Sequence, residues 1–335
     1  MTRTGIGQDG YFRLQKEVAF GTDIVTSMTD IPLKEGLTKG FSEMIENANF
    51  QGSRMKQEPD AGRTVCPLAS LKMDYYPDLV GAIYQLFLGA ASSSSEVDST
   101  YTHTWLIPKT GERIGNSFTA QQAVGIDLVD QFAGCTISAL VLEADTQGNM
   151  TMTFETRPQG YTEDVARISS FTFPTTTPFN WSFGAVSMTP LAGESKTDAC
   201  INSMTMRIDL QYDLERYKVG DKKIKQPTYL SIPQVTLDLN VDAERLFLTD
   251  ARILKEWDIT LIFISTEYAG GTTAFQLDLE LPGARLSPET EIPNENDALS
   301  MDLSFDCGYG GFTTGSPAAD VIGELRIVDA TAAYA

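Results

Sequence analysis

Residues 204–212 read MTMRIDLQY, and apolar and polar side chains alternate through the whole stretch. Met204, Met206 and Ile208 would share one face of a β-strand, while the residues between them would share the other. The same alternation recurs at residues 150–155, 235–241, 275–281 and 301–307. Strands with one apolar and one polar face are typical of antiparallel sheets that cover a core and show water their other side. The sequence therefore predicts a mainly β protein, built as an antiparallel β-sandwich or barrel.

Polar and turn-forming segments separate the alternating stretches. Pro282-Gly283 and residues 308–311 are predicted as turns, and residues 90–100, which include four consecutive serines, as a loop. Residues 34–63 are polar and without periodicity, and a loop of that length in a compact domain is usually functional or disordered. Residues 212–227 carry basic side chains around a Gly-Asp pair, which predicts a basic-tipped β-hairpin. This hairpin is either a contact for an acidic patch on a neighbouring copy or a solvated loop.

Two stretches break the alternation and are predicted as short flanking helices. After Pro77, Asp78 is expected to cap a helix that ends at Gly89. Residues 250–257 indicate a second helix, with Trp257 on its apolar side. Each helix lies between two predicted strands, at residues 70–75 and 102–107 and at residues 234–241 and 259–264.

The order strand, helix, strand thus occurs twice, which favours an internal duplication. The halves would be residues 1–165 and 166–335, and the alternative is that two β domains share this order by chance. A chain of 335 residues has room for one large domain or two ordinary ones.

The charge balance limits the partners of the chain. The sequence has 25 Lys and Arg against 45 Asp and Glu, for a net charge of −20. General affinity for nucleic acid needs cations that displace counterions from phosphates, so this balance argues against it. An acidic surface also repels anionic membranes, and the alternative interpretation is that the charge serves only solubility.

The cysteines and the chain start indicate a protein made in the cytoplasm. Four cysteines, at positions 66, 135, 200 and 307, lie far apart in apolar stretches, so buried free thiols are expected and a disulfide framework is not. The start shows no basic segment followed by an apolar core, so no secretion signal is expected. No apolar run approaches the ~20 residues of a membrane span.

Residues for catalysis, cofactors or metals are not apparent. The sole histidine, His103, alternates like a strand residue, so a His-based metal cluster is ruled out and a structural role is favoured. No phosphate-binding loop occurs, and the acidic stretch at residues 293–297 lacks calcium-loop spacing. A glycoside hydrolase needs only two carboxylates, but the candidates lie on polar strand faces where exposure to water explains them. These candidates are Asp209, Asp238, Asp278 and Glu280.

A β-sandwich adhesin or carbohydrate-binding module is the alternative interpretation. Trp105, Trp181 and Phe183 offer aromatic faces on which sugars stack. Core packing by alternation explains Trp181 and Phe183 more simply.

Several features in order resemble the major tail tube protein family of long-tailed, siphovirus-type bacteriophages. The opening runs from Gly5-Ile6-Gly7 to the EVAFGT stretch at residues 17–22, followed by Ile31-Pro32-Leu33 and the long loop. The later features are the strand at residues 71–75, the helix ending at residues 86–89, and residues 101–104, 279–282, 301–307 and 324–328. The resemblance covers nearly the whole chain and depends on this order of features.

The resemblance implies a structural virion protein that polymerises. It implies a tube domain with a β-sandwich and a flanking helix, packed in rings that stack into the hollow phage tail. Single-domain members form hexameric rings, and a duplicated chain would allow a trimer with pseudo-six-fold symmetry. Further partners would be the tape measure protein in the lumen and the tail terminator and distal tail proteins at the ends. No enzyme activity, cofactor, metal or membrane contact is implied.

Contacts between copies are expected in the long loop at residues 34–63, the N- and C-terminal arms and the basic hairpin. The candidate contact residues are Phe41, Met44, Arg54, Lys56, Arg63, Arg216, Lys218, Lys222, Lys223 and Lys225. Strand edges that pair around a ring would close a continuous barrel. Its polar faces would line the lumen, where carboxylates repel phosphates so that DNA passes without specific binding.

Overall fold

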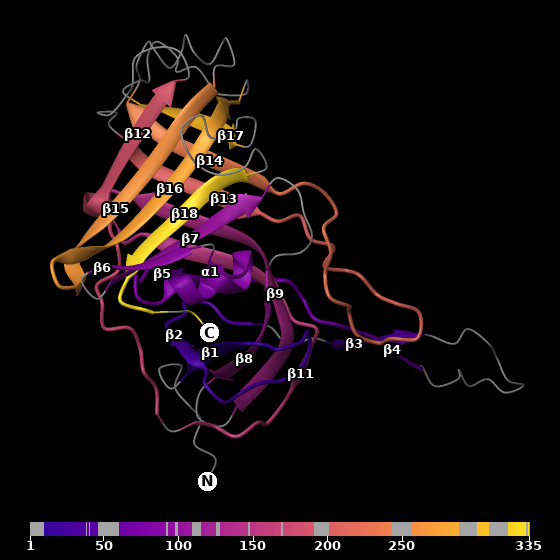
Figure 1. The fold of residues 1–335 in the computed structure, drawn as a ribbon. Coiled ribbons are helices and arrows are strands. Elements are labelled where there is room, and N and C mark those ends of the chain that lie inside the picture. The colour runs from indigo at the N-terminus through magenta and orange to yellow at the C-terminus, as the bar shows by residue number, and fades with distance from the viewer. Residues whose placement is uncertain are drawn as a thin grey trace, which may run out of the picture.

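The computed structural model describes residues 10–37, 39, 41–45, 60–91, 93–97, 100–108, 115–124, 128–146, 148–168, 170–190, 201–242, 256–287, 300–307, 321–332 and 334. Nearly all of its strands join one antiparallel network (Figure 1). The network folds into two layers whose strands cross at an angle, with a smaller sheet below them. The predicted mainly β, antiparallel sandwich is therefore confirmed.

The first sheet joins strands from early and late parts of the chain. Its order is β5 (Ala69–Asp74), β10 (Thr151–Arg157), β9 (Leu128–Asp145), β13 (Ile201–Asp209), β14 (Gln234–Asp242) and β17 (Ser300–Cys307). Leu140 of β9 lies opposite Phe154 on one side and Ile208 on the other. The alternation in β10, β13, β14 and β17 therefore places one apolar face toward the interior and one polar face toward solvent.

The second sheet covers the apolar face of the first. Its order is β12 (Gly184–Pro190), β15 (Glu256–Gly270), β16 (Thr273–Leu286), β18 (Val321–Asp329), β7 (Thr100–Pro108) and β6 (Ser93–Val97). The end of β16 crosses to the first sheet, where Arg285 and Leu286 pair with β17. The predicted turn at Pro282-Gly283 is wrong, because both residues lie inside β16. There they form a bulge, with Gly283 at φ 64°, and the bulge turns the strand from one sheet toward the other.

A single apolar cluster lies between the two sheets. Trp257, Phe263 and Leu279 from the second sheet join Leu237 and Phe305 from the first, and none is more than 1% exposed. Each such side chain contributes about 1.5–3 kcal/mol by burial. The cluster includes strands from both predicted halves of the chain.

The EVAFGT stretch at residues 17–22 forms a turn beside a smaller sheet. This sheet joins β2 (Thr29–Ile31), β1 (Tyr11–Lys16), β8 (Ser117–Val124), the lower half of β9, and β11 (Gly160–Thr162). The buried Glu17 carboxylate accepts hydrogen bonds from the Gly21 and Gly134 amides, both at 2.8 Å, and from the Thr119 hydroxyl at 3.0 Å. Gly134, at φ 62°, lies where β9 bends between the two sheets. Glu17 therefore fixes both the turn after β1 and the bend of β9.

The helical predictions are partly corrected. Helix α1 (Val80–Leu88) packs beside β9 and β7 and ends at Gly89, as predicted, but its N-cap residue is Leu79 and has no side-chain cap. Asp78 instead accepts a hydrogen bond from the Thr176 hydroxyl at 2.7 Å. The predicted second helix is wrong at Trp257, which lies in β15; residues 250–255 fall outside the described residues.

Two predicted loops contain strands. Part of residues 90–100 forms β6, which pairs with β7, because a serine-rich segment tolerates an edge position. Residues 34–63 contribute β3 (Phe41–Ile45) and the start of β4 (Asp60–Val65), which form a separate two-stranded sheet. The turn predicted at residues 308–311 lies outside the described residues. The division into halves at residue 165 stays a prediction.

Candidate assembly surfaces

The polar face of the first sheet is strongly acidic, and we call it the acidic face. Cross-strand register places Asp238 between Thr205 and Ser304, and Asn240 beside Asp302, on this one face. The carboxylates on the acidic face are Asp74, Glu143, Asp145, Glu155, Asp209, Asp238, Asp242, Asp302 and Asp306. Within these six strands Lys72 and Arg207 are the cations on this face, so nine negative and two positive charges leave a net charge of −7. At the edge, Arg285 of β16 lies opposite Asp306 and is paired with Glu256. The face runs without a break from β5 to β17.

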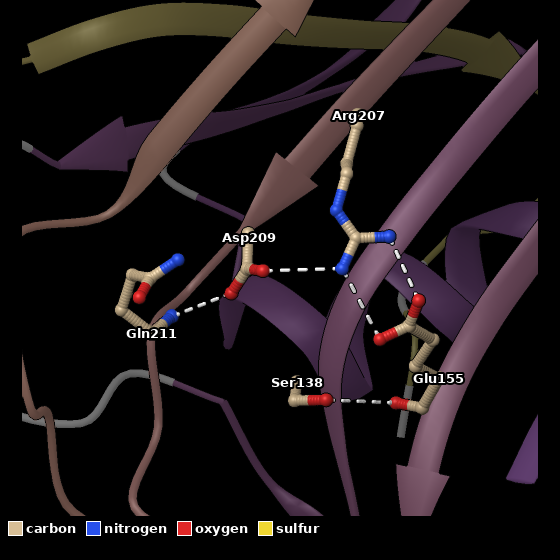
Figure 2. Close-up of polar contacts among 5 residues, drawn as sticks. All are labelled: Ser138, Glu155, Arg207, Asp209 and Gln211. Atoms are coloured by element: carbon tan, nitrogen blue, oxygen red, sulfur yellow. Dashed lines mark hydrogen bonds and ion pairs between the residues drawn. The ribbon is translucent and has the colours of Figure 1, made fainter.

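One ion-pair network on this face lies where the chain leaves β13 (Figure 2). The Arg207 guanidinium donates to both carboxylate oxygens of Glu155, at 2.7 and 3.2 Å, and to Asp209 at 3.1 Å. The hydrogen bond to Glu155 raises the pKa of Arg207, despite partial burial. Asp209 in turn accepts from the backbone amide of Gln211 at 2.8 Å, and Gln211 adopts a left-handed conformation at φ 52°. The network thus fixes the direction in which residues 211–230 depart.

A β-bulge in β9 makes room for this departure. The register between β9 and β10 shifts at Glu155, which leaves Ser138 as the extra residue. The Ser138 carbonyl accepts from the Leu210 amide at 2.9 Å, and its hydroxyl donates to the Glu155 carbonyl at 3.4 Å.

The outer face of the second sheet holds a smaller acidic group. Arg326 lies 2.6 Å from Glu324, 3.5 Å from Asp278 and 3.9 Å from Glu280. Burial raises the pKa of Glu280. The positive charge of Arg326 opposes this shift, and the negative charges of Glu324 and Asp278 add to it. Asp278 is 7% exposed, so the prediction that exposure to water explains its presence is wrong for this residue. Asp209 and Asp238 lie on the other sheet, so the predicted carboxylates do not form one site.

The predicted contact segments lie against each other. The β3–β4 hairpin extends away from the sandwich, and the loop of residues 211–230 runs out beside it (Figure 1). We call the loop of residues 211–230 the brace loop. The brace loop together with β3 and β4 is called the arm. The Thr64 amide donates to the Lys222 carbonyl at 2.7 Å, and the Tyr217 hydroxyl donates to the Thr64 carbonyl at 3.1 Å. The Arg63 guanidinium lies over the Tyr217 ring, 4.7 Å from its centroid.

The brace loop is not the β-hairpin that the sequence predicted. Its two sides are joined irregularly: the backbone amides of Asp213, Lys225 and Leu230 donate to the carbonyls of Thr228, Arg216 and Gln211, each at 2.8 Å, and one isolated bridge links Tyr212 and Tyr229. That its basic side chains contact a second copy stays a prediction.

The predicted contact residues have different outcomes. Phe41 and Met44 lie in β3, opposite Val65 and Ala61 of β4. Arg54 and Lys56 fall outside the described residues. The remaining six belong to the arm: Arg63, Arg216, Lys218, Lys222, Lys223 and Lys225.

Arg157 and Gln159, which sequence reasoning missed, hold the base of the arm. Arg157 is 8% exposed and donates to the Cys66 carbonyl at 2.9 Å and to the Glu215 carboxylate at 3.2 Å. The Gln159 side-chain amide donates to the carbonyl of buried Ile224 at 2.8 Å. No local pattern marks these residues, because the groups they bind come from distant segments. A cation at the end of an alternating strand, as at Arg157, was the one available signal.

His103 has the structural role that the sequence predicted. Its Nε2 atom lies 2.8 Å from the Thr331 carbonyl and 3.6 Å from the Asp329 carboxylate, which also accepts from the Tyr334 hydroxyl. Burial raises the pKa of Asp329. Tyr334 packs over Gly81 of α1, so the C-terminal residues lie against the chain's own helix. Their contact with a neighbouring ring stays a prediction, and the N-terminal arm at residues 1–9 is outside the described residues.

The structure places the cysteines and the aromatic residues that were candidates for sugar stacking. Cys66, Cys135 and Cys307 are free; the first two are also buried, as predicted, whereas Cys307 is only partly buried, and Cys200 is outside the described residues. Burial raises the pKa of all three thiols, to about 12 for Cys307, where Asp306 adds to the effect. Trp105 is 1% exposed, so it cannot stack on a sugar. Trp181 and Phe183 lie in the 3₁₀ helix η2 (Trp181–Phe183) rather than in a strand.

No group of three or more His, Cys, Asp or Glu side chains among the described residues is arranged to hold a metal ion. None of the described helices has the length and apolar character to cross a bilayer.

Residues 7–308 match the family model described as phage tail tube protein. No curated protein matches the chain.

Proposed function

The chain belongs to the phage tail tube protein family, and we propose that its copies close into rings that stack into a hollow conduit for the viral genome. Family membership makes the chain a structural protein of the virion tail that self-assembles into a tube. The finer proposal concerns which surface faces the lumen. One observation supports it above the others: the acidic face is a continuous sheet surface with a net charge of −7.

We assign the acidic face to the lumen because of its electrostatics. A phosphate about 10 Å from one carboxylate is repelled by about 0.4 kcal/mol in water, before screening by salt. A wall in which carboxylates outnumber cations therefore gives DNA no place to bind. The brace loop, which is basic, would bind DNA if it lined the lumen, so it belongs to the outer or ring-to-ring surfaces.

The first sheet has edges that neighbouring copies can extend. On its outer side, β17 pairs with β16 only at Asp306 and Phe305, so among the described strands residues 300–303 are paired on one side. At the opposite end, β5 pairs with β10, and its outer side makes one isolated bridge, between Met73 and Leu33. Two different edges give a head-to-tail contact, and such contacts close into rings when the rotation allows.

Ring size and the remaining partners follow from the predicted duplication and the family. If the halves are repeats, three chains supply six tube units, so we propose a trimer with pseudo-six-fold symmetry over a hexamer. Family membership supports a tape measure protein in the lumen during assembly, and terminator and distal tail proteins at the two ends.

Thiol labelling of assembled tubes tests the lumen assignment. In a Cys200→Ser background, Asp238→Cys places a thiol on the acidic face, and Tyr268→Cys places one on the second sheet, where Tyr268 is 65% exposed. Both variants should react with small and with polymer-linked maleimides as monomers. In tubes, the bulky reagent should still label Tyr268→Cys and should fail to label Asp238→Cys. Equal labelling of both sites in tubes would show that the acidic face points outward.

A further inference from the structure

The brace loop completes a hairpin that cannot be stable alone. An isolated two-stranded hairpin is at best marginally stable in water. Here the outer side of β4 is bonded at Thr64, whose amide and carbonyl are both satisfied by the brace loop. The Tyr217 ring adds a contact with Arg63. The loop thus covers the outer side of β4 at Thr64 and fixes the direction of the hairpin there.

The base of the arm is anchored to the sandwich through a buried cation. Arg157, at the end of β10, binds the root of the hairpin through the Cys66 carbonyl and the root of the brace loop through Glu215. Its side chain is 9% exposed, whereas that of Glu215 is 78% exposed, so the stronger restraint is the bond to Cys66. Gln159 holds the second side of the loop at Ile224. Two segments separated by about 150 residues are therefore held in one orientation.

The charge of the brace loop indicates what the arm binds. Within residues 211–230, five basic side chains outnumber Asp213, Glu215 and Asp221, so the brace loop has a net charge of +2 in a chain of net charge −20. At its tip, Lys218 is exposed, Val219 is fully exposed and Gly220 has φ 90°. A basic projection on an acidic protein is attracted to other copies of that protein.

We propose that the hairpin and the brace loop form one preorganised arm that binds a second copy, and that Arg157 and Tyr217 are its positioning residues. This inference rests on the proposed function, because it needs copies that assemble. Its physical content is that assembly requires the arm in a single direction. If loosening leaves about a tenth of the molecules with the arm in that direction, apparent affinity falls about tenfold.

Three variants separate positioning from folding and from charge. Tyr217→Ala removes the hydroxyl donor and the ring from a half-exposed loop side chain, and Tyr217→Phe removes only the donor. Lys218→Glu reverses a charge at the tip and leaves every bond of the brace in place. Tyr268→Ala is the matched control, because Tyr268 is exposed on the turn side of β15, far along the chain from the arm.

Hydrogen exchange of the monomeric full-length chain tests the brace directly. In Tyr217→Ala the Thr64 amide should exchange at least tenfold faster than in the wild type, with a smaller effect in Tyr217→Phe. Lys218→Glu and Tyr268→Ala should leave that amide unchanged. Arg157→Met should accelerate exchange at both Thr64 and the hairpin root. Unchanged exchange at Thr64 in Tyr217→Ala would overturn the brace whether or not the chain assembles.

The critical concentration for assembly tests the second half of the inference. It should rise about tenfold in Tyr217→Ala and also in Lys218→Glu. The unfolding temperature of both variants should stay within about 1–2 °C of the wild type, because neither residue is in the core and a surface substitution changes the free energy of unfolding by about 0.5 kcal/mol or less. Tyr268→Ala should assemble like the wild type. Tyr217→Ala tubes that form at the wild-type concentration despite faster Thr64 exchange would overturn the arm as an assembly contact. A wild-type chain that never assembles would instead contradict the proposed function.

Discussion

Removal of the Arg207 side chain tests the ion-pair network that directs the brace loop away from β13. Arg207→Met leaves the carboxylates of Glu155 and Asp209 facing each other without a shared cation. The side chains are 38%, 22% and 25% exposed, for Arg207, Glu155 and Asp209, so the network lies between the surface and the interior.

The expected loss follows from that exposure. Fully exposed pairs contribute about 0.2–1 kcal/mol, and breaking a buried pair costs about 3–5 kcal/mol. For a bidentate pair at this depth we expect Arg207→Met to lower the free energy of unfolding by about 2 kcal/mol. Since the entropy of unfolding is about 2.1 cal/mol/K per residue, this corresponds to about 3 °C in Tm for the whole chain. Lys225→Met is the matched control: Lys225 and Asp221 are each 43% exposed, and a loss under about 0.5 kcal/mol is expected.

A double-mutant cycle with Glu155→Gln isolates the pair. Guanidinium denaturation of the wild type, both single variants and the double variant should give a coupling energy of about 1 kcal/mol. The Gln211 amide should also exchange faster in Arg207→Met, because its acceptor Asp209 loses its partner. If Arg207→Met is no less stable than Lys225→Met, and its effect adds to that of Glu155→Gln, the network does not hold this junction.

Three further predictions concern charge, pH and thiols. Asp238→Lys with Asp302→Lys changes the net charge of the acidic face from −7 to −3, so tubes should form normally while DNA delivery by phage carrying the variant falls; normal infection would contradict the lumen assignment. The pKa of Glu280 is raised on folding, so its contribution to stability is present below the ordinary carboxyl pKa and is lost as the pH rises. Glu280→Gln should therefore raise Tm at pH 7 and leave it unchanged at pH 3.5, and a gain at both values would refute this origin. In Cys200→Ser the three remaining thiols should resist a disulfide reagent at pH 8 until the protein is unfolded, because their pKa values are raised; rapid labelling of the native protein would contradict this.

The strands that the sequence predicts are those covered on one side only. Strands β10, β13, β14, β16 and β17 carry their signal locally, because one face is apolar and the other is wet. Strand β9 gives no such signal between Cys135 and Leu142, where both faces are mostly buried. The segment around Trp257 also fits a helical pattern. Trp257 instead pairs with Ala284 across strands, so the second predicted helix is wrong at this residue.

The candidate surfaces depend even more on tertiary structure. The basic character of the brace loop is visible in the sequence, and so is the polarity of residues 34–63. The contact between these two segments is not visible in the sequence, because the bonds at Thr64, Tyr217 and Arg157 join residues about 90 to 150 positions apart. The acidic face likewise exists only once register places strands from both halves side by side.

A cryo-electron microscopy map of filaments grown from the purified chain tests the central claim most directly. The account predicts a hollow tube whose inner wall is the polar side of β5, β10, β9, β13, β14 and β17, with Asp238 and Asp302 at the lumen. A solid fibre, or a tube with those carboxylates on its outside, would contradict it.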